Sequence, residues 1–227
     1  MMRLSLSNHS LSCYIRLMQG KDVSQVTEID QLIFPTMRPA ISYHSELQNK
    51  LAHYVVACGK EMIAADTGRG EERGGLHGIT SWLGGIFRHR HSPEDETAKL
   101  RQYIFGFAGL WMMADEAHII NIAVREQYRR QGIGELLLIA MIDLAVEMKA
   151  RFIVLEARVS NTIAQGLYAK YGFKAVGIRR AYYTDNHEDA VMMSTGDITS
   201  DGFKVNLKRL KEIHARMWGV DNYEVAR

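Results

Sequence analysis

The chain has 227 residues, of which 47% are hydrophobic and 24% charged, ordinary values for a globular protein with one sizeable core. Its formal net charge of +2 excludes the strong pull towards nucleic acid or membrane surfaces that markedly basic proteins show. Cys13 and Cys58 indicate neither a disulfide framework nor a zinc site, and no apolar stretch approaches the roughly 20 residues that span a bilayer, so we expect a cytoplasmic protein.

The first part of the chain is predicted to alternate strands and helices. Apolar residues recur at near-helical spacing over 21–33 and predict a helix there. The other expected elements are a flexible arm at 1–13, a strand at 14–18, a helix at 43–52 and a strand at 54–57. Residues 66–102 are rich in glycine and end in a charged patch, so we interpret them as an insertion between two strands.

Regular structure resumes after the insertion. The expected elements are strands at 103–113 and 117–124, a helix at 132–149, a strand at 152–158, a helix at 162–170, and an antiparallel pair at 174–183 and 189–194. They predict one α/β domain over 14–195, with a mixed central β-sheet flanked by helices. Residues 196–227 form a C-terminal extension, in which an apolar stripe predicts a helix over 204–218. We expect this helix to cover the domain, although its basic face leaves docking on RNA or a ribosome open.

A glycine-containing loop opens the longest apolar helix. Its residues are Arg129, Arg130, Gln131, Gly132, Ile133 and Gly134. Glycines before a helix allow a tight curl, so that free N–H groups converge at the positive end of the helix dipole and can bind a diphosphate. The spacing is neither the dinucleotide fingerprint nor a P-loop, and chain reversal alone could explain the glycines.

The same segment resembles the acetyl-CoA-binding loop of the GNAT superfamily of N-acetyltransferases. Further segments resemble the RimI-type branch of this superfamily, the ribosomal-protein-alanine N-acetyltransferases. These segments are 155–161, Leu167-Tyr168, Tyr171-Gly172-Phe173, 179–183 and His187-Glu188-Asp189-Ala190. The resemblance covers residues 14–195 with a gap, and is specific over 116–194. It implies the GNAT fold, acetyl-CoA as co-substrate, and a protein N-terminus as acceptor, with a ribosomal protein as the candidate.

Glu156 and Tyr168 are the candidate catalytic residues. Acetyl transfer needs a base for the amine and an acid for the departing thiolate. Glu156 follows an apolar run, and partial desolvation in a cleft would raise its pKa and make it a better base, although it could instead pair with Arg158 on the same strand face. The resemblance places Tyr168 beside the CoA sulfur as general acid, whereas a packed tyrosine with a tied hydroxyl is the structural alternative.

Further cofactor contacts are expected from main-chain amides and one side chain. If two strands splay apart, the amides of Ile122, Ala123 and Val124 can serve the oxyanion and the pantetheine arm; an ordinary buried strand is the alternative. The resemblance adds a CoA contact from Asn161, which could equally act only as a helix N-cap. Glu135, directly after the loop, departs from the family pattern and would weaken phosphate binding unless its side chain points away.

The acceptor amine can be argued from its pKa. Deprotonation at neutral pH costs about 1 kcal/mol for an α-amine and about 4–5 kcal/mol for lysine, so one modest base favours an N-terminus. Tyr182 and Tyr183 would line the peptide entrance or pack across strands, and Glu188 and Asp189 would attract a cationic substrate or be solvated. A lysine or small-amine acetyltransferase and a non-catalytic CoA-binding module are the other hypotheses.

No metal is expected. His77, His89 and His91 lie in the insertion, but their pattern lacks the ligands and geometry of a metal site. The sequence makes no prediction of oligomeric state.

Overall fold

A computed structural model describes residues 13–35, 41–64 and 100–219. The chain divides into two compact units, one formed by residues 1–60 with 104–227 and the other by residues 61–103. The second unit overlaps the predicted insertion at 66–102. The N-terminal arm, most of the insertion and its three histidines lie outside the described residues, and Cys13, predicted as part of the arm, already belongs to the first strand.

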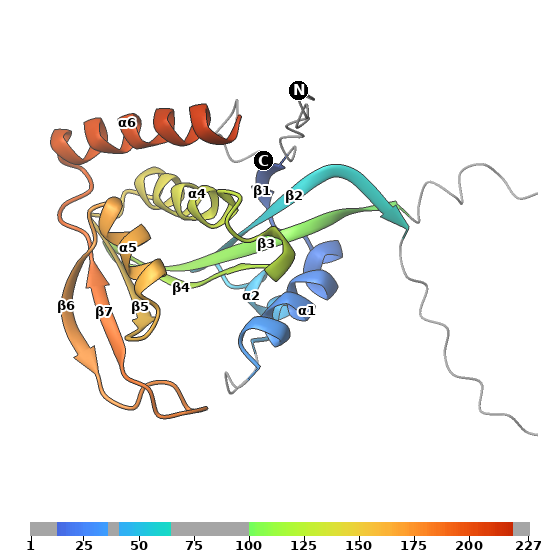
Figure 1. The fold of residues 1–227 in the computed structure, drawn as a ribbon, viewed down its shortest axis with the longest axis horizontal. Coiled ribbons are helices and arrows are strands. Elements are labelled where there is room, and N and C mark those ends of the chain that lie inside the picture. The colour runs from blue at the N-terminus through green and yellow to red at the C-terminus, as the bar shows by residue number, and fades with distance from the viewer. Residues whose placement is uncertain (1–12, 36–40, 65–99, 220–227) are drawn as a thin grey trace, which may run out of the picture. The chain divides into compact units, whose positions relative to one another are not determined.

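A seven-stranded mixed sheet forms the centre of the fold, in the order β1-β2-β3-β4-β5-β7-β6 (Figure 1). The strands are β1 (Cys13–Leu17), β2 (Ala52–Ala64), β3 (Leu100–Met113), β4 (Glu116–Val124), β5 (Phe152–Arg158), β6 (Lys174–Arg179) and β7 (Ala190–Ser194). The pairs β1–β2, β3–β4, β5–β7 and β6–β7 are antiparallel, whereas β4 and β5 are parallel. The predicted mixed sheet flanked by helices is confirmed.

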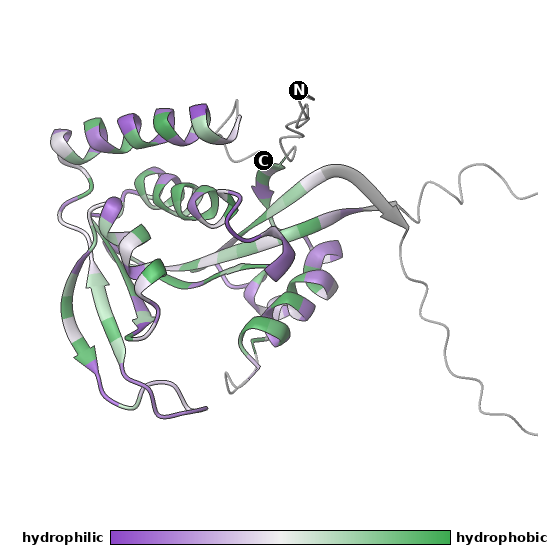
Figure 2. Cartoon of the chain, in the orientation of Figure 1, coloured by the Kyte–Doolittle hydropathy of each residue, from purple (hydrophilic) through white to green (hydrophobic). Residues whose placement is uncertain are grey.

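Four of the described helices connect strands, and the fifth, α6, comes after the last strand. They are α1 (Val23–Ile33), α2 (Tyr43–Glu46), α4 (Ile133–Glu147), α5 (Thr162–Lys170) and α6 (Asp201–Trp218), with 3-10 turns at Gly20–Asp22 and Glu126–Tyr128. Helix α4 is apolar almost all round and has ten buried residues (Figure 2). This pattern is typical of a helix covered on several sides, and α4 contacts both β4 and α6. None of the helices within the described ranges is both long and apolar enough to cross a bilayer.

Several predicted elements differ in length from the observed ones. Helix α2 stops at Glu46 rather than 52, because Asn49 accepts the amides of Leu51 and Ala52 in a tight turn. Strand β2 is far longer than 54–57, since only its buried part stands out as an apolar run. The closing pair is shorter than predicted, because β6 ends at Arg179 and β7 begins at Ala190.

The C-terminal helix α6 runs along α4 (Figure 1). Leu207, Leu210 and His214 are buried, and the Lys211 ammonium binds both carboxylate oxygens of Asp143 on α4 at 2.9 and 2.7 Å. The prediction that this helix covers the domain is confirmed, but the predicted stripe is partly wrong. Two residues of that stripe, Val205 and Met217, are 69% and 59% exposed. The face that contacts the domain consists instead of Leu207, Leu210 and His214, which are spaced three and four residues apart.

Candidate active site

Strands β4 and β5 part in the middle of the sheet. Their parallel register ends at the pair Ile119–Leu155, although β4 continues to Val124 and β5 to Arg158. A bulge in β4 coincides with the parting, since the β3–β4 register shifts between Gly109 and Leu110. The sheet therefore has a notch that leaves backbone groups of β4 unpaired on the β5 side, in agreement with the first of the two alternatives that the sequence left open.

The direction of the β4 amides follows from strand alternation. The N–H of Arg125 donates to the carbonyl of Phe105 on β3 at 2.8 Å. Alternate residues of an antiparallel strand face the same neighbour, so Ala123 also faces β3, and Ile122 and Val124 face the notch. The prediction that Ala123 donates there does not fit this direction, whereas Ile122 and Val124 can serve.

The glycine loop is tightly curled where β4 leads into α4. Gly132 is the N-cap of α4 with φ 77°, and Arg130 also has a positive φ of 59°. Such left-handed residues turn successive N–H groups towards one side, ahead of the unpaired amides of the first helical turn. The Arg129 guanidinium donates to the carbonyl of Val124 at 3.2 Å and thus ties the loop to the end of β4. This curl is the backbone conformation predicted for anion binding, and residues 129–134 are called the anion loop below.

Substitution at Gly132 tests this geometry. We expect Gly132→Ala to lower the melting temperature and to weaken CoA binding about tenfold or more, since a left-handed alanine costs roughly 1–2 kcal/mol. Its Cβ would also lie 2.6 Å from the Trp218 ring. Gly202→Ala is the control, because nothing lies within 4 Å of its added Cβ. If calorimetry gave Gly132→Ala the same Kd for CoA as the unsubstituted protein, the loop assignment would be contradicted.

Glu135, the departure from the family pattern, has its carboxylate bound by two side chains of the protein. Its carboxylate pairs with the Lys170 ammonium and accepts from the Tyr171 hydroxyl at 2.6 Å, both at the end of α5. The neighbouring lysine compensates its charge.

Glu156 lies on β5 in a polar triad with residues of two other strands. Its Oε2 lies 2.7 Å from His118 Nε2 on β4, and its Oε1 lies 3.1 Å from Arg179 Nη2 at the end of β6. These contacts, led by the His118 hydrogen bond, outweigh desolvation and lower the pKa of Glu156. The predicted rise in this pKa is therefore wrong, because the cleft supplies a hydrogen-bond donor and a cation as well as burial.

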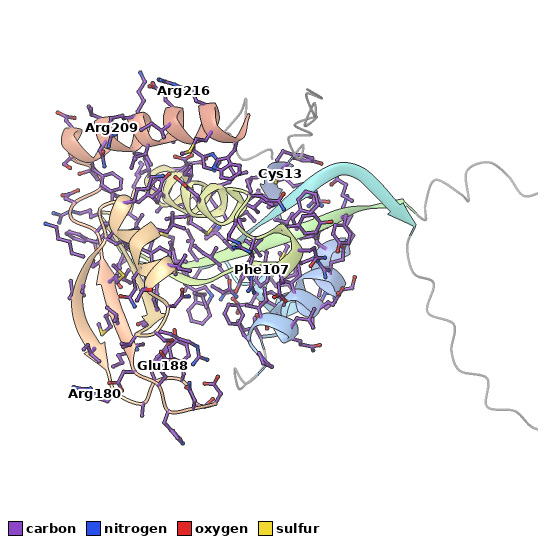
Figure 3. The ribbon with its side chains drawn as sticks, in the orientation of Figure 1. Cys13, Phe107, Arg180, Glu188, Arg209 and Arg216 are labelled. Atoms are coloured by element: carbon purple, nitrogen blue, oxygen red, sulfur yellow. The ribbon has the colours of Figure 1, made fainter. Side chains whose placement is uncertain are left out.

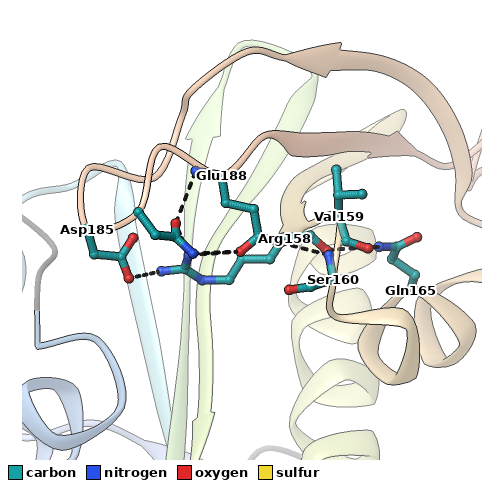
Figure 4. A network of polar contacts seen from close by, with 7 residues as sticks. Arg158, Val159, Ser160, Gln165, Asp185 and Glu188 are labelled. Carbon is teal, nitrogen blue, oxygen red and sulfur yellow. Dashed lines mark hydrogen bonds and ion pairs between the residues drawn. The ribbon is translucent and has the colours of Figure 1, made fainter.

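The predicted pairing of Glu156 with Arg158 is also wrong. The Arg158 guanidinium binds Asp185 at 2.7 Å and Glu188 at 3.1 Å (Figure 4). It also lies 3.9 Å from the centre of the Tyr183 ring. Glu188 also accepts the Ser160 amide at 2.7 Å, and these bonds lower its pKa to about 2. Asp189 binds Arg180 and the amide of Ala181. Both acids are partly exposed residues that hold the loop after β6, as one of the two alternatives predicted.

Tyr168 lies on α5 with its ring near Phe173. Burial raises its pKa to about 12, so the phenol stays protonated at neutral pH. No hydrogen-bond partner of its hydroxyl lies among the described residues, which argues against a tied-off structural tyrosine. Asn161 is the N-cap of this helix, with its Oδ1 accepting the Ala164 amide at 3.1 Å, and its side chain is exposed. The N-cap role of Asn161 is thus confirmed, and a CoA contact stays a prediction.

Tyr182 and Tyr183 lie beyond the end of β6, so the predicted cross-strand packing is wrong. Their rings meet edge to face at 5.2 Å. Burial is the main cause that raises both pKa values, to about 12 for Tyr183, and Glu156 adds an electrostatic contribution to each. The Tyr183 pKa is also raised by Tyr168. These interactions relate Tyr182 to Glu156, and Tyr183 to both candidate catalytic residues.

A cavity of about 200 Å³ lies between α1 and the turn after β4. Its wall is apolar on the α1 side, from Ile29, Leu32 and Ile33, and polar on the other, from Arg125, Glu126, Gln127 and Arg129. Neither Glu156 nor Tyr168 lines it, so it is a neighbouring feature.

His118, which is a hydrogen-bond partner of Glu156, was not identified from the sequence. Its strand neighbour on β5 is Val154, so Glu156 lies two residues further on the same face, a relation that depends on knowing the β4–β5 register. Within 13–35, 41–64 and 100–219, no group of three or more His, Cys, Asp or Glu side chains could hold a metal ion.

Comparison with known proteins gives the class. The sequence profile of the acetyltransferase (GNAT) family matches residues 78–173. A protein of Bacillus subtilis, provisionally named a ribosomal protein bS18-alanine N-acetyltransferase, is 34% identical over 180 residues, covering 79% of this chain and 92% of that protein. The chain belongs to the acetyltransferase (GNAT) family.

Two further relatives refine the comparison. An N-alpha-acetyltransferase of Sulfurisphaera tokodaii is 45% identical over 94 residues, which are 40% of this chain and 56% of that protein. The crystal structure of the ribosomal-protein-S18-alanine N-acetyltransferase from Escherichia coli superposes with a TM-score of 0.54 at 25% identity, covering 82% of this chain and 94% of that one. The predicted fold and the RimI-type resemblance are confirmed.

Proposed function

We propose that this protein transfers the acetyl group of acetyl-CoA to the N-terminal α-amine of a protein. The observation that carries the proposal is the notch between β4 and β5, with the Glu156–His118 pair where the strands part and Tyr183 interacting electrostatically with both Glu156 and Tyr168. Relatives named as N-terminal acetyltransferases support the choice of reaction.

The anion loop and the notch fit the two ends of acetyl-CoA. The amides of Gln131, Gly132, Ile133 and Gly134 would bind the diphosphate, with charge added by Arg129 and Arg130. The free edge of β4 at Ile122 and Val124 would pair with the amide groups of the pantetheine arm and donate to the thioester oxygen. Acetyl-CoA supplies the activated acyl group, and Asn161 is proposed as a further contact.

Acetyl transfer would proceed by direct attack of the amine on the thioester. The nitrogen forms a bond to the carbonyl carbon and loses a proton to the Glu156–His118 pair. The carbon–sulfur bond then breaks, and the hydroxyl of Tyr168 protonates the departing thiolate. A pKa of about 12 keeps the phenol protonated at neutral pH, so that its proton is available when the thiolate leaves.

The low basicity of Glu156 favours an α-amine over lysine. An α-amine has a pKa near 7.7–8.0 and lysine near 10.4, so at neutral pH the second costs roughly 3 kcal/mol more to deprotonate. A carboxylate whose pKa is lowered by His118 and Arg179 gives little help with that difference. The site therefore suits an amine that is partly neutral already.

The peptide would enter beside the loop after β6. Tyr182 is 41% exposed and Tyr183 half-buried, which suits aromatic contacts to a peptide backbone. Ribosomal protein S18 is named as the substrate of the Escherichia coli relative, and a ribosomal protein is the first acceptor to test here.

Matched peptides test the proposal. One peptide carries a free N-terminus and an internal lysine, and the other has the same sequence with a blocked N-terminus. We expect a single acetyl group on the first residue of the free peptide and none on the blocked one, located by fragment mass spectra. Acetylated lysine in both peptides would favour the alternative of a lysine acetyltransferase. CoA binding without transfer to any peptide or small amine would favour a binding module.

A further inference from the structure

The last turns of α6 lie against the anion loop. The N-cap of α6 is Ser200, whose hydroxyl accepts the amide of Phe203, and its C-cap is Gly219 in the left-handed conformation. Figure 3 shows exposed Arg209 and Arg216 on it, whereas Leu207, Leu210 and His214 are buried. The helix is thus fixed at both ends and packed along one face.

His214 contacts the backbone of the loop directly. Its Nε2 lies 3.0 Å from the carbonyl oxygen of Gly132, which accepts, so the imidazole nitrogen donates. The same carbonyl accepts the first intrahelical bond of α4, from the Leu136 amide at 2.9 Å. His214 is only 1% exposed, and burial lowers its pKa, so its neutral form prevails at neutral pH.

Trp218 closes the other side of the same residue. A Cβ added to Gly132 would meet three atoms of the indole ring at 2.6–2.7 Å, so the ring packs flush on the bare Cα. Gly132 is therefore required for two reasons, its positive φ and the proximity of Trp218. The indole and the imidazole hold the residue at which the loop turns into α4.

We propose that α6 is a positioning element for the diphosphate loop, with His214 and Trp218 as its positioning residues. The inference rests on the proposed CoA site. Left-handed Arg130 and Gly132 give the loop a conformation that needs support from outside. A loop already held in its binding shape loses less freedom when the diphosphate arrives, and binding is correspondingly tighter.

Binding and kinetics of variants test this role. In His214→Ala and Trp218→Ala we expect the Kd for CoA and the KM for acetyl-CoA to rise about tenfold each, the size of one lost supporting interaction. The kcat at saturating acetyl-CoA and the KM for peptide should stay within about twofold, because the catalytic groups lie elsewhere. The conservative variants His214→Gln, whose amide can donate, and Trp218→Phe should recover most of the affinity. Met217→Ala, on the exposed face, is the matched control.

The outcomes separate this inference from the proposed function. CoA affinities of His214→Ala and Trp218→Ala equal to that of Met217→Ala would overturn the positioning role while leaving the CoA site intact. If the unsubstituted protein fails to bind CoA, both the site and the inference are rejected. Should His214→Ala fail to fold, Trp218→Ala decides the question through the KM-to-kcat split, since loss of folded protein lowers apparent kcat and leaves KM unchanged.

Discussion

Replacing Tyr168 by phenylalanine is expected to lower kcat about 100-fold or more, the usual contribution of a general acid, while the Kd for acetyl-CoA changes little. The ring and its contact with Phe173 are retained in the variant, so only the hydroxyl is lost. Because no described residue accepts from or donates to that hydroxyl, its removal breaks no structural hydrogen bond there. The expected loss is therefore specific to the chemical step.

Three measurements check the assignment of Tyr168. Steady-state kinetics give kcat, calorimetry gives the CoA affinity, and thermal unfolding should show a melting temperature within a few degrees of the unsubstituted protein. Tyr171→Phe is a control with a different expectation, since its hydroxyl binds Glu135 and its loss should affect stability more than turnover. Equal losses of kcat and CoA affinity in Tyr168→Phe would count against the acid role.

Replacing Glu156 by glutamine is the second large effect. Glutamine keeps the shape of the side chain and removes its negative charge, so the pair with His118 can still form a hydrogen bond but cannot accept the proton of the amine. We expect kcat/KM for the peptide to fall about 100-fold, with unchanged CoA binding. His118→Ala should reproduce part of this loss. A glutamine variant with near-normal turnover would show that the carboxylate is a structural partner of His118 and Arg179 only.

The pH dependence distinguishes the base from the substrate. The pKa of Glu156 is lowered, so its carboxylate stays ionised down to a lower pH than that of an ordinary glutamate. It is lost as a base only in more acidic solution. The rise of kcat/KM with pH near neutrality should therefore follow the substrate α-amine, with an apparent pKa near 7.7–8.0. Glu156→Gln should keep that rise at a lower level. An apparent pKa that shifts when Glu156 is replaced would contradict this division of roles.

Local patterns were sufficient for much of the fold. Strand β5 and helix α5 lie at the predicted residues, because alternation of buried and exposed side chains and the Asn161 cap are signals within a few positions. The parting of β4 and β5 was one of two alternatives at Ile122, Ala123 and Val124, and the β4–β5 register decides for it. Helix α2 was predicted too long, because the turn at Asn49 depends on one side chain inside an otherwise helical pattern.

The surroundings of the site could not be read in the same way. Glu156 meets His118 and Arg179 only after the four strands β4, β5, β7 and β6 have been placed side by side, and the sign of its pKa shift depends on those partners. The contacts of His214 and Trp218 with Gly132 join residues more than 80 positions apart. Burial of Glu156 was visible in the sequence, but the charges that oppose its effect were not.

A structure of the protein with bound CoA tests the central claim most directly. We expect the diphosphate to lie on the amides of residues 131–134, the pantetheine arm to run along Ile122 and Val124, and the sulfur to lie within about 3–3.5 Å of the Tyr168 hydroxyl. A diphosphate bound elsewhere, or a sulfur outside the notch and out of reach of Tyr168, would contradict it.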